Sequence, residues 1–466
     1  MTYTLEQEDI FSTCLQMQTN EIVSIIAPAG GGKTFVLSEL AKQMPKEKIL
    51  YLAYNKAIKQ EAKNKFPKNT QIETVHSLAY SCLKLNDKVV REKDYTVLDI
   101  SEMFDIDFET ANFALISFNE FCNSNKKGFT RKEYNEKQEI KIAYELFKKM
   151  KNREIQITHS FYLKEFELIV SDKPNLFDFT VILLDEAQDS NEVTLSIFNS
   201  FFAKKIFVGD PNQAIYSFRN CVNAFDIVKC NYQLRITDCY RCSANILERA
   251  NFLLQHFKHI DYKIKSKQKE NIPSAPTKAV ITRTNAKIIE LISKQSDKNY
   301  VLLKNPNDIF KNSIVFVNFL KNRKEKIDYN NFVFLKKCKN EQQLKEYIEQ
   351  SGSIELKSAF RIAKIYGDRI FKLYRIAKEN YNKKKSLENI YYLTTAHTSK
   401  GLEFDCVELT NDFPDLFSLL EQKINNEECN TNIIEEINLY YVAITRAKFI
   451  LDDTTKTGQE IDSLDI

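Results

Sequence analysis

The stretch Ser24–Thr34, SIIAPAGGGKT, turns from an apolar run into three glycines, a lysine and a threonine. Ile22–Ile26 has the β-branched content of a buried strand, and Phe35–Met44 has the pattern of a helix. Glycines at such a turn let backbone N–H groups curl around phosphate oxygens, next to the positive end of the helix. The stretch therefore predicts a phosphate-binding loop made of Ala27, Ala29, Gly30, Gly31, Gly32, Lys33 and Thr34.

A second motif, which is acidic, has the chemistry that this loop requires. The segment TVILLDEAQDS is an apolar strand that ends in Asp185 and Glu186. With a phosphate loop in the same chain, Lys33 is expected to reach the β and γ phosphates, and Thr34 to hold Mg²⁺. Asp185 would hold the same ion through water, and Glu186 would polarise the attacking water. The two motifs together predict hydrolysis of a nucleoside triphosphate with Mg²⁺.

Length and composition indicate an ordinary multidomain protein. The chain has 466 residues, of which 43% are hydrophobic and 28% charged, so we expect two to four domains. It has no run of 18 uncharged apolar residues, and the segment MTYTLEQED lacks the pattern of a secretion signal. We therefore expect a cytoplasmic protein with no membrane partner. The net charge of +4 is too small to indicate nucleic-acid binding by itself.

The ten scattered cysteines fit reduced thiols better than a disulfide framework. One cluster leaves an alternative open, because Cys239 and Cys242 precede His256 and His259 with a spacing close to that of a zinc site. The other interpretation is an amphipathic helix over Ile246–His259, with the cysteines as small core residues.

Apolar strands and helical stretches alternate in a way that predicts an α/β fold with parallel sheets. We expect a first domain over residues 1–225, with a helical insertion at about 80–165. A second domain would cover 226–455, with a smaller helical insertion at about 290–385. Residues 456–466 are expected to form a frayed acidic tail.

Several polar and aromatic residues follow predicted strands, where open α/β sheets bind their ligands. Asn55 and His76 suit contacts to the backbone and bases of a single strand. The segment GDPNQAIYSFRN places Gln213 to sense a γ-phosphate, and offers Tyr216, Phe218 and Arg219 as a stacking platform with a phosphate contact. Near the N-terminus, the amide of Gln7 could read an adenine edge.

The order of these motifs resembles superfamily 1 DNA helicases of the UvrD/Rep type. The motifs are Gln7, APAGGGKT, AYNKA, TVHS, LLDEAQDS, GDPNQAIYSFR, YRCS, TAHTSKGLEF and YVAITRAK, which lie between residues 4 and 448. Within that group, the segment AYNKAIKQEAKNKFPKNTQIETVHSLAY is most similar to the F-box DNA helicases, although we expect no F-box segment before the motor.

The resemblance implies two RecA-like P-loop NTPase domains and a role for each motif residue. Gln7 would contact adenine, while Gln213, Arg241, Glu403 and Arg446 would surround the γ-phosphate. Arginines from the second domain can neutralise transition-state charge only when the domains close, which couples hydrolysis to motion. The DNA side would comprise Asn55, His76, Tyr216, Phe218, Arg219 and His397.

The family often has Trp where Phe218 stands and an aromatic residue where Ala53 stands. The resemblance implies ATP-driven 3′ to 5′ stepping on single-stranded DNA and action on duplex junctions, in repair, recombination or replication. Two other readings stay open. One is a DNA-dependent ATPase that acts as sensor or loader for a partner nuclease, as in phage defence. The other is an RNA-directed motor or a nucleotide switch.

Overall fold

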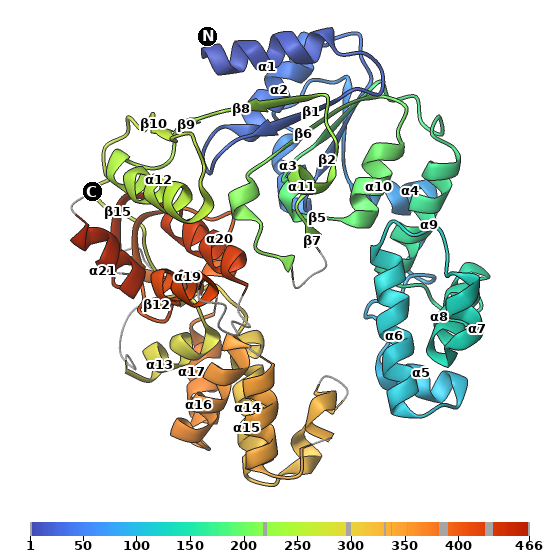
Figure 1. The fold of residues 1–466 in the computed structure, drawn as a ribbon, viewed down its shortest axis with the longest axis vertical. Helices are drawn as coiled ribbons and strands as arrows, with labels where there is room; N and C mark the ends of the chain where they lie inside the picture. The colour runs from blue at the N-terminus through green and yellow to red at the C-terminus, as the bar shows by residue number, and fades with distance from the viewer. Residues whose placement is uncertain are drawn as a thin grey trace. The chain divides into compact units, whose positions relative to one another are not determined.

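The computed structural model divides the chain into two compact units, Met1–Ile236 and Thr237–Ile466 (Figure 1). The residues that it describes are 2–217, 221–294, 300–329, 332–336, 338–351, 353–381, 390–424 and 432–464. The division lies about ten residues beyond the expected boundary at 225/226. The reason is that strand β8 (Tyr232–Arg235) pairs with strand β1 of the first unit.

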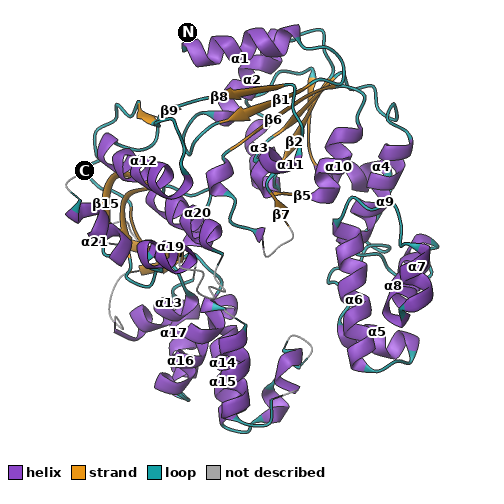
Figure 2. Cartoon of the chain, in the orientation of Figure 1, coloured by secondary structure: helices purple, strands orange, loops and turns teal. Residues whose placement is uncertain are grey.

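The first unit contains a six-stranded sheet in which every pairing is parallel (Figure 2). Its strand order is β3-β2-β4-β6-β1-β8. The bounds are β1 Ile22–Ile26, β2 Ile49–Ala53, β3 Thr70–Thr74, β4 Val181–Leu184 and β6 Lys204–Gly209. Because all these strands run the same way, the residues that follow their carboxyl ends gather at one edge.

Helices cover both faces of this sheet. On one face α1 (Leu5–Gln16) and α2 (Lys33–Gln43) pack Ile10 and Leu37 into a core with the strand residue Ile25. On the other face, the ring of Phe207 in β6 contacts Phe198 and Phe225. Those two rings belong to α10 (Glu192–Ser200) and α11 (Ala224–Ile227).

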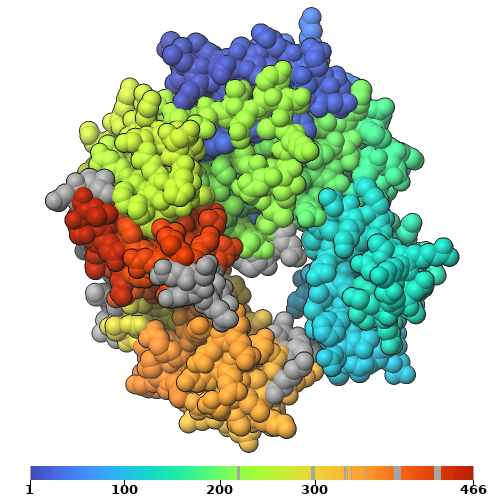
Figure 3. Space-filling view, viewed as in Figure 1, coloured from blue at the N-terminus to red at the C-terminus, as the bar shows by residue number. Residues whose placement is uncertain are grey.

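The segment between β3 and β4 is helical, as the sequence indicates for residues 80–165, although its helices extend further at both ends. They are α4 Val75–Cys82, α5 Val97–Phe104, α6 Phe108–Asn123, α7 Arg131–Glu136, α8 Gln138–Lys151 and α9 His159–Asp172. In the space-filling view α5 to α8 form a lobe that stands out from the rest of the first unit (Figure 3). Buried Lys164 and Glu167 join α9 to α10, because Lys164 Nζ lies 2.9 Å from Glu167 Oε2 and Ser196 donates to Glu167 Oε1 at 2.6 Å.

The second unit contains a parallel five-stranded sheet of order β12-β13-β11-β14-β15. Its strands are β11 Lys278–Thr282, β12 Tyr300–Leu302, β13 Tyr391–Thr395, β14 Phe404–Leu409 and β15 Ala447–Asp453. The main helices of this unit are α12 Ala244–Lys258, α13 Asn285–Lys294, α19 Leu416–Ile424 and α20 Ile433–Ile444. The two units are therefore both α/β, with parallel sheets as expected.

The helical insertion expected at 290–385 begins later than the sequence indicates. Strand β12 lies within that range and pairs with β13, so the inserted helices start at Pro306. They are α14 Pro306–Leu320, α15 Glu341–Gln350, α16 Ile354–Tyr366 and α17 Arg369–Glu379. Their apolar faces share one core, in which Phe310, Leu344 and Ile370 are all buried.

The expectation of a frayed tail over 456–466 is wrong for most of that segment. Residues Lys456–Ser463 form helix α21, and Ile461 in it is only 4% exposed. Arg249 of α12 forms an ion pair with Asp462, which attaches the helix to the unit. At least one of the acidic residues that suggest a solvated tail, Asp462, thus pairs with a cation of the second unit.

The remaining short elements are α3 Lys56–Ala62, β5 Ser190–Asn191, β7 Cys221–Val222, β9 Asp238–Cys239, β10 Lys265–Ser266 and α18 Ala396–Ser399, with 3-10 turns at Ala187–Asp189, Pro211–Gln213, Lys324–Lys326 and Val333–Lys336. Within the described residues, no helix combines the length and the apolar character needed to cross a bilayer.

Candidate active site

The glycine-rich loop lies between the carboxyl end of β1 and the start of α2, as predicted. Gly30 and Gly32 have φ values of 72° and 76°, a region that residues with a Cβ rarely adopt. A Cβ on Gly31 would lie 2.9 Å from Pro28 Cδ and 3.0 Å from Pro28 O, so this position also requires glycine. Helix α2 begins without a side-chain cap, which leaves the N–H groups of its first turn available to an anion.

The predicted lysine, threonine and carboxylates come together at this edge of the sheet. Lys33 Nζ lies 3.4 Å from Glu186 Oε1. Thr34 Oγ1 donates to Asp185 Oδ2 at 3.4 Å. The loop after β1 and the acidic pair after β4 therefore form one polar cluster, although they are about 150 residues apart in the sequence.

Asp185 is the buried member of this cluster, with 3% of its surface exposed. Its Oδ2 also accepts a 2.6 Å hydrogen bond from the Tyr51 hydroxyl, and its Oδ1 accepts from the backbone N–H of Glu186. Burial raises the pKa of Asp185, and the neighbouring Glu186 carboxylate raises it further. This carboxylate pair lies where a cation would be stabilised.

Glu186 is held by a chain of amides that continues to the next strand. Gln188 Nε2 donates to Glu186 Oε2 at 2.6 Å, and Gln188 Oε1 accepts from Asp210 N at 3.1 Å. Gln213 Nε2 in turn donates to Asp210 Oδ2 at 2.8 Å. Glu186 itself has a φ of 52°, an uncommon conformation for a residue with a side chain. The candidate base and the candidate γ-phosphate sensor are thus linked through two intermediates.

The donor set fits ATP with Mg²⁺. Oxygen atoms of Thr34 and Asp185 are the ligand type that Mg²⁺ prefers, and Lys33 adds a positive charge beside the loop. The raised pKa of Asp185 shows that its carboxylate is destabilised by burial and by Glu186, and a bound cation would stabilise it. The uncapped N–H groups at the start of α2 would likewise be stabilised by a bound phosphate.

Three further residues of the predicted nucleotide site have structural contacts of their own. Gln7, which is 5% exposed, closes a capping box at the start of α1, where its Oε1 accepts from Thr4 N at 3.1 Å. That bond uses the oxygen of the side-chain amide and not its nitrogen. Ala27 and Ala29 are buried, and Ala27 N donates to Gly209 O at 2.9 Å, which joins the loop to β6.

Arg241 and Glu403, both predicted at the γ-phosphate, bind each other in the second unit. Arg241 Nε donates to Glu403 Oε2 at 2.9 Å, and Lys448 Nζ lies 2.8 Å from Glu403 Oε1. Burial alone would raise the pKa of Glu403, but the hydrogen bond from Lys448 and the charge of Arg241 lower it below its ordinary value.

Arg446 is buried at 1% exposure within the second unit. Its guanidinium donates to Val442 O at 2.9 Å, Leu402 O at 3.0 Å and Thr445 Oγ1 at 3.2 Å. Arg241 Nη1 donates to the carbonyl of the same Thr445 at 3.4 Å. The two arginines are therefore anchored at adjacent points of one backbone turn.

Two of the predicted nucleic-acid residues also support local structure. Asn55 is the N-cap of α3, where its Oδ1 accepts from Ile58 N at 2.9 Å. His76 Nδ1 forms a 3.1 Å hydrogen bond with the Tyr162 hydroxyl, which links α4 to α9. Both side chains are exposed, so these contacts leave surface for a ligand.

Two further residues predicted on the DNA side are partly exposed. Tyr216 is partly exposed after the turn that contains Gln213, and His397 is partly exposed in the short helix α18 of the second unit. Phe218 and Arg219 lie outside the described residues, so their predicted stacking and phosphate contacts have no structural counterpart here.

The cysteine and histidine cluster does not converge on a metal position. The described parts of the chain hold no group of three or more His, Cys, Asp or Glu side chains placed to bind a metal ion. Cys239 and Cys242 are fully buried, and Cys242 N donates to Cys239 Sγ. His256 instead stacks on Phe252, with ring centroids 5.1 Å apart.

Sequence reasoning missed Tyr51 and Gln188. Tyr51 is the one hydroxyl-bearing residue in the strand ILYLA, and a phenol in an otherwise aliphatic buried strand is a usable signal. Gln188 lies two residues beyond Glu186 within the acidic motif itself. Both act on a carboxylate that the sequence identifies.

Comparison with known proteins agrees with this geometry. Residues 12–219 match the family model described as AAA domain, and residues 287–452 match the UvrD-like helicase C-terminal domain. F-box DNA helicase 1 of Gallus gallus is 26% identical over 96% of this chain and 48% of its own length. F-box DNA helicase protein 1 of Schizosaccharomyces pombe is 27% identical over 94% of this chain and 56% of its own.

RecBCD enzyme subunit RecB of Buchnera aphidicola subsp. Acyrthosiphon pisum is 27% identical over 63% of this chain and 25% of its own length. The chain spans about half the length of the F-box helicases that it matches. The first unit contains a phosphate loop with its acidic pair, and most of the second unit matches a helicase domain. Both observations indicate the same family. The chain belongs to the UvrD-like superfamily 1 helicases.

Proposed function

We propose that this protein is an ATP-dependent DNA helicase or translocase that moves 3′ to 5′ along single-stranded DNA. The observation that carries the proposal is the cluster of Lys33, Thr34, Asp185 and Glu186 at one edge of the first sheet. The names of the F-box relatives, which are DNA helicases, support DNA as the polymer. We further propose that it acts in the cytoplasm, in repair, recombination or replication.

The proposed chemistry assigns each residue one task. Lys33 and the N–H groups at the start of α2 neutralise phosphate charge, and Thr34 and Asp185 hold Mg²⁺. Glu186 accepts a proton from the attacking water, while Gln188 keeps its carboxylate oriented. Bound ATP with Mg²⁺ would supply the phosphoanhydride whose cleavage drives stepping.

The remaining residues are proposed to couple this chemistry to DNA. Gln213 senses the γ-phosphate, and Arg241 and Arg446 add positive charge to the transition state, with Glu403 orienting Arg241. Gln7 contacts adenine through its side-chain nitrogen. Single-stranded DNA and duplex junctions bind along Asn55, His76, Tyr216, Phe218, Arg219 and His397.

Steady-state ATP hydrolysis tests the proposal most directly. It is measured without nucleic acid, with single-stranded DNA and with single-stranded RNA. We expect low basal turnover, strong stimulation by DNA and loss of turnover in Glu186→Gln. The matched control is Glu61→Gln, whose carboxylate is exposed on α3. A wild-type enzyme that hydrolyses ATP but responds to neither polymer would contradict the motor assignment.

Direction is tested on duplexes that carry a single-stranded tail at one end only. Movement 3′ to 5′ predicts displacement from the 3′-tailed duplex and not from the 5′-tailed one. The reverse preference would leave the ATPase assignment intact and overturn the direction alone.

A second candidate is a DNA-dependent ATPase that loads or senses for a partner nuclease and unwinds little by itself. The similarity to a RecB subunit, whose name places it in a multi-subunit enzyme, favours this alternative. DNA-stimulated hydrolysis without strand displacement by the purified chain would support it. Displacement that appears only when a co-purified protein is added would support it further.

A further inference from the structure

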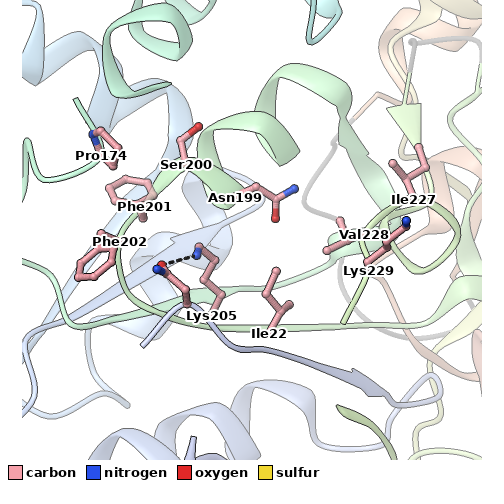
Figure 4. Close-up of a pocket in the computed structure, with 11 residues that line it drawn as sticks. Ile22, Pro174, Asn199, Ser200, Phe201, Phe202, Lys205, Ile227, Val228 and Lys229 are labelled. Atoms are coloured by element: carbon pink, nitrogen blue, oxygen red, sulfur yellow. Dashed lines mark hydrogen bonds between the residues drawn. The ribbon is translucent and has the colours of Figure 1, made fainter. Parts of the chain in front are cut away.

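A cavity of about 510 Å³ lies in the first unit, away from the phosphate loop (Figure 4). Ile22, the first residue of β1, lines it, whereas the phosphate loop follows the other end of the same strand. The cavity therefore lies at the amino edge of the sheet, and none of the residues assigned to ATP or DNA lines it.

Its floor is a buried lysine that has no acidic partner within the described part of the chain. Lys205 of β6 is 3% exposed, and its Nζ donates to Asn20 Oδ1 at 3.4 Å and to Ala203 O at 3.5 Å. Both bonds are at the long end of the hydrogen-bond range. Among the described residues, no acidic group pairs with this ammonium group, and burial is the only influence on its pKa.

The adjacent residue, Lys204, has the acidic partner that Lys205 lacks within the described residues. Lys204 points to the opposite face of β6, as successive strand residues do, and lies 3.2 Å from Glu47 Oε1. Lys205 has no such counter-charge, and burial lowers its pKa to about 8. A buried cation is costly unless an anion accompanies it.

The cavity walls show what kind of anion would fit. Phe201 and Phe202 lie on one side in Figure 4, and Ile227 and Val228 on the other. Lys229 adds a second, exposed cation. As far as the structure describes the chain, the lining residues include no Asp or Glu; they are Asn20, Ile22, Pro174, Asn199, Ser200, Phe201, Phe202, Lys205, Ile227, Val228 and Lys229. Apolar walls around a few polar groups, in a space of this size, are typical of small-ligand sites.

We propose that this cavity binds an organic carboxylate with an apolar body, in which the carboxylate pairs with Lys205 and the body packs against Phe201, Phe202 and Ile227. Such a group occurs on a free aromatic or aliphatic acid and at the C-terminus of a protein that ends in an apolar residue. The site is separate from the proposed motor chemistry and does not depend on it.

The absence of tryptophan from the chain provides a specific reporter. Phe202 lines the cavity and is 56% exposed, so Phe202→Trp places the single indole of the protein at the site without filling its core. The fluorescence of this variant is titrated with phenylacetate and hexanoate, and with the corresponding neutral amides. We expect the acids to bind at least tenfold more tightly than their amides.

Two lysine variants in the Phe202→Trp background test the anchor. Lys205→Met keeps the volume and removes the charge, and we expect at least a tenfold loss of acid binding. Lys204→Met changes the adjacent lysine on the other face, and we expect acid binding to persist. A tripeptide ending in Phe, as free acid and as amide, separates the two sources: tighter binding of the tripeptide acid than of phenylacetate indicates a protein C-terminus, and the reverse indicates a free acid.

Several outcomes would overturn the proposal. These are equal binding of acids and amides, no binding of any acid at millimolar concentration, or full binding by Lys205→Met. The comparison of acid with amide needs no lysine variant, so it remains decisive even if Lys205→Met does not fold.

Discussion

The Gln188 side chain donates a 2.6 Å hydrogen bond to Oε2 of Glu186. Its other end accepts from Asp210 N, so the carboxylate is held relative to the end of β6. The space is tight, because a Cβ placed on Gly209 would meet Gln188 Oε1. Glycine at 209 and glutamine at 188 thus fix the orientation of the proposed base together.

Gln188→Ala should lower the turnover number of DNA-stimulated ATP hydrolysis by roughly ten- to a hundredfold, with little change in KM for ATP. A hydrogen bond to a charged group contributes about 1.5–3 kcal/mol, and about 1.4 kcal/mol is a factor of ten in rate. Steady-state kinetics measures both constants. Gln233→Ala, on the exposed side of β8, is the control. A large rise in KM for ATP together with the fall in turnover would indicate general disruption of the site instead.

Tyr51→Phe should destabilise the nucleotide-free protein by about 1–3 kcal/mol, because buried Asp185 loses one of its donors. For a unit of this size each kcal/mol corresponds to a decrease in Tm of about 2–4 °C. Differential scanning calorimetry measures the change, with the exposed Tyr232→Phe as the control. An unchanged Tm would show that the hydroxyl contributes nothing to the fold.

Glu167→Gln should cost on the order of 3–5 kcal/mol of unfolding free energy, because it leaves the Lys164 ammonium buried without its counter-charge. Glu165→Gln on the same helix is the matched comparison, because the ion pair between Glu165 and Arg153 is partly exposed to solvent. Urea unfolding of the three proteins gives the difference. Equal midpoints for both variants would contradict the assigned role of the buried pair.

The same carboxylate predicts a pH dependence. Burial alone would raise the pKa of Glu167, but hydrogen bonds from Lys127, Ser196 and Lys164 lower it below its ordinary value of 4.5. A depressed pKa stabilises the fold above pH 4.5, and that contribution is lost as the pH falls through the lower folded-state value. Urea midpoints between about pH 3 and pH 7 should therefore fall at the acid end, and less steeply in Glu167→Gln.

Ile461→Ala should destabilise the second unit by roughly 2–4 kcal/mol, the range for truncating a well-buried aliphatic side chain. Leu464→Ala, at a 51% exposed position just beyond α21, should have almost no effect. Urea unfolding followed by circular dichroism checks both. Equal urea midpoints for the two variants would indicate that this segment is frayed.

The clustering of the candidate site residues was predictable where a motif marks the end of a strand. Lys33 and Asp185 meet because β1 and β4 are parallel strands of one sheet, and parallel strands present their carboxyl ends together. Tyr51 and Gln188 could not be assigned this way, because their roles follow from contacts with Asp185 and Glu186 and not from a spacing. The capping role of Gln7 is different, because Thr4 and Gln7 have the spacing of a capping box, a local signal that is present in the sequence.

The fold was predictable in class and less so at its boundaries. Strand Ile22–Ile26 has the bounds that its β-branched run predicts. Strand β8, with the sequence YQLR, is mostly exposed and has no apolar run, so its pairing with β1 is visible only in three dimensions. Helix α21 contains a single buried aliphatic side chain and depends on Arg249, more than 200 residues earlier. Both differences arise from long-range partners.

The strand that carries the phosphate loop has a consequence for synthesis on the ribosome. Strand β1 ends at Ile26, and its partners β6 and β8 begin at Lys204 and Tyr232. At about 5–20 residues per second, the nascent chain carries β1 without either neighbour for roughly ten to forty seconds. During that interval an apolar strand with two open edges must be shielded from other chains. The speed of translation over residues 27–203 therefore sets how long β1 requires this protection.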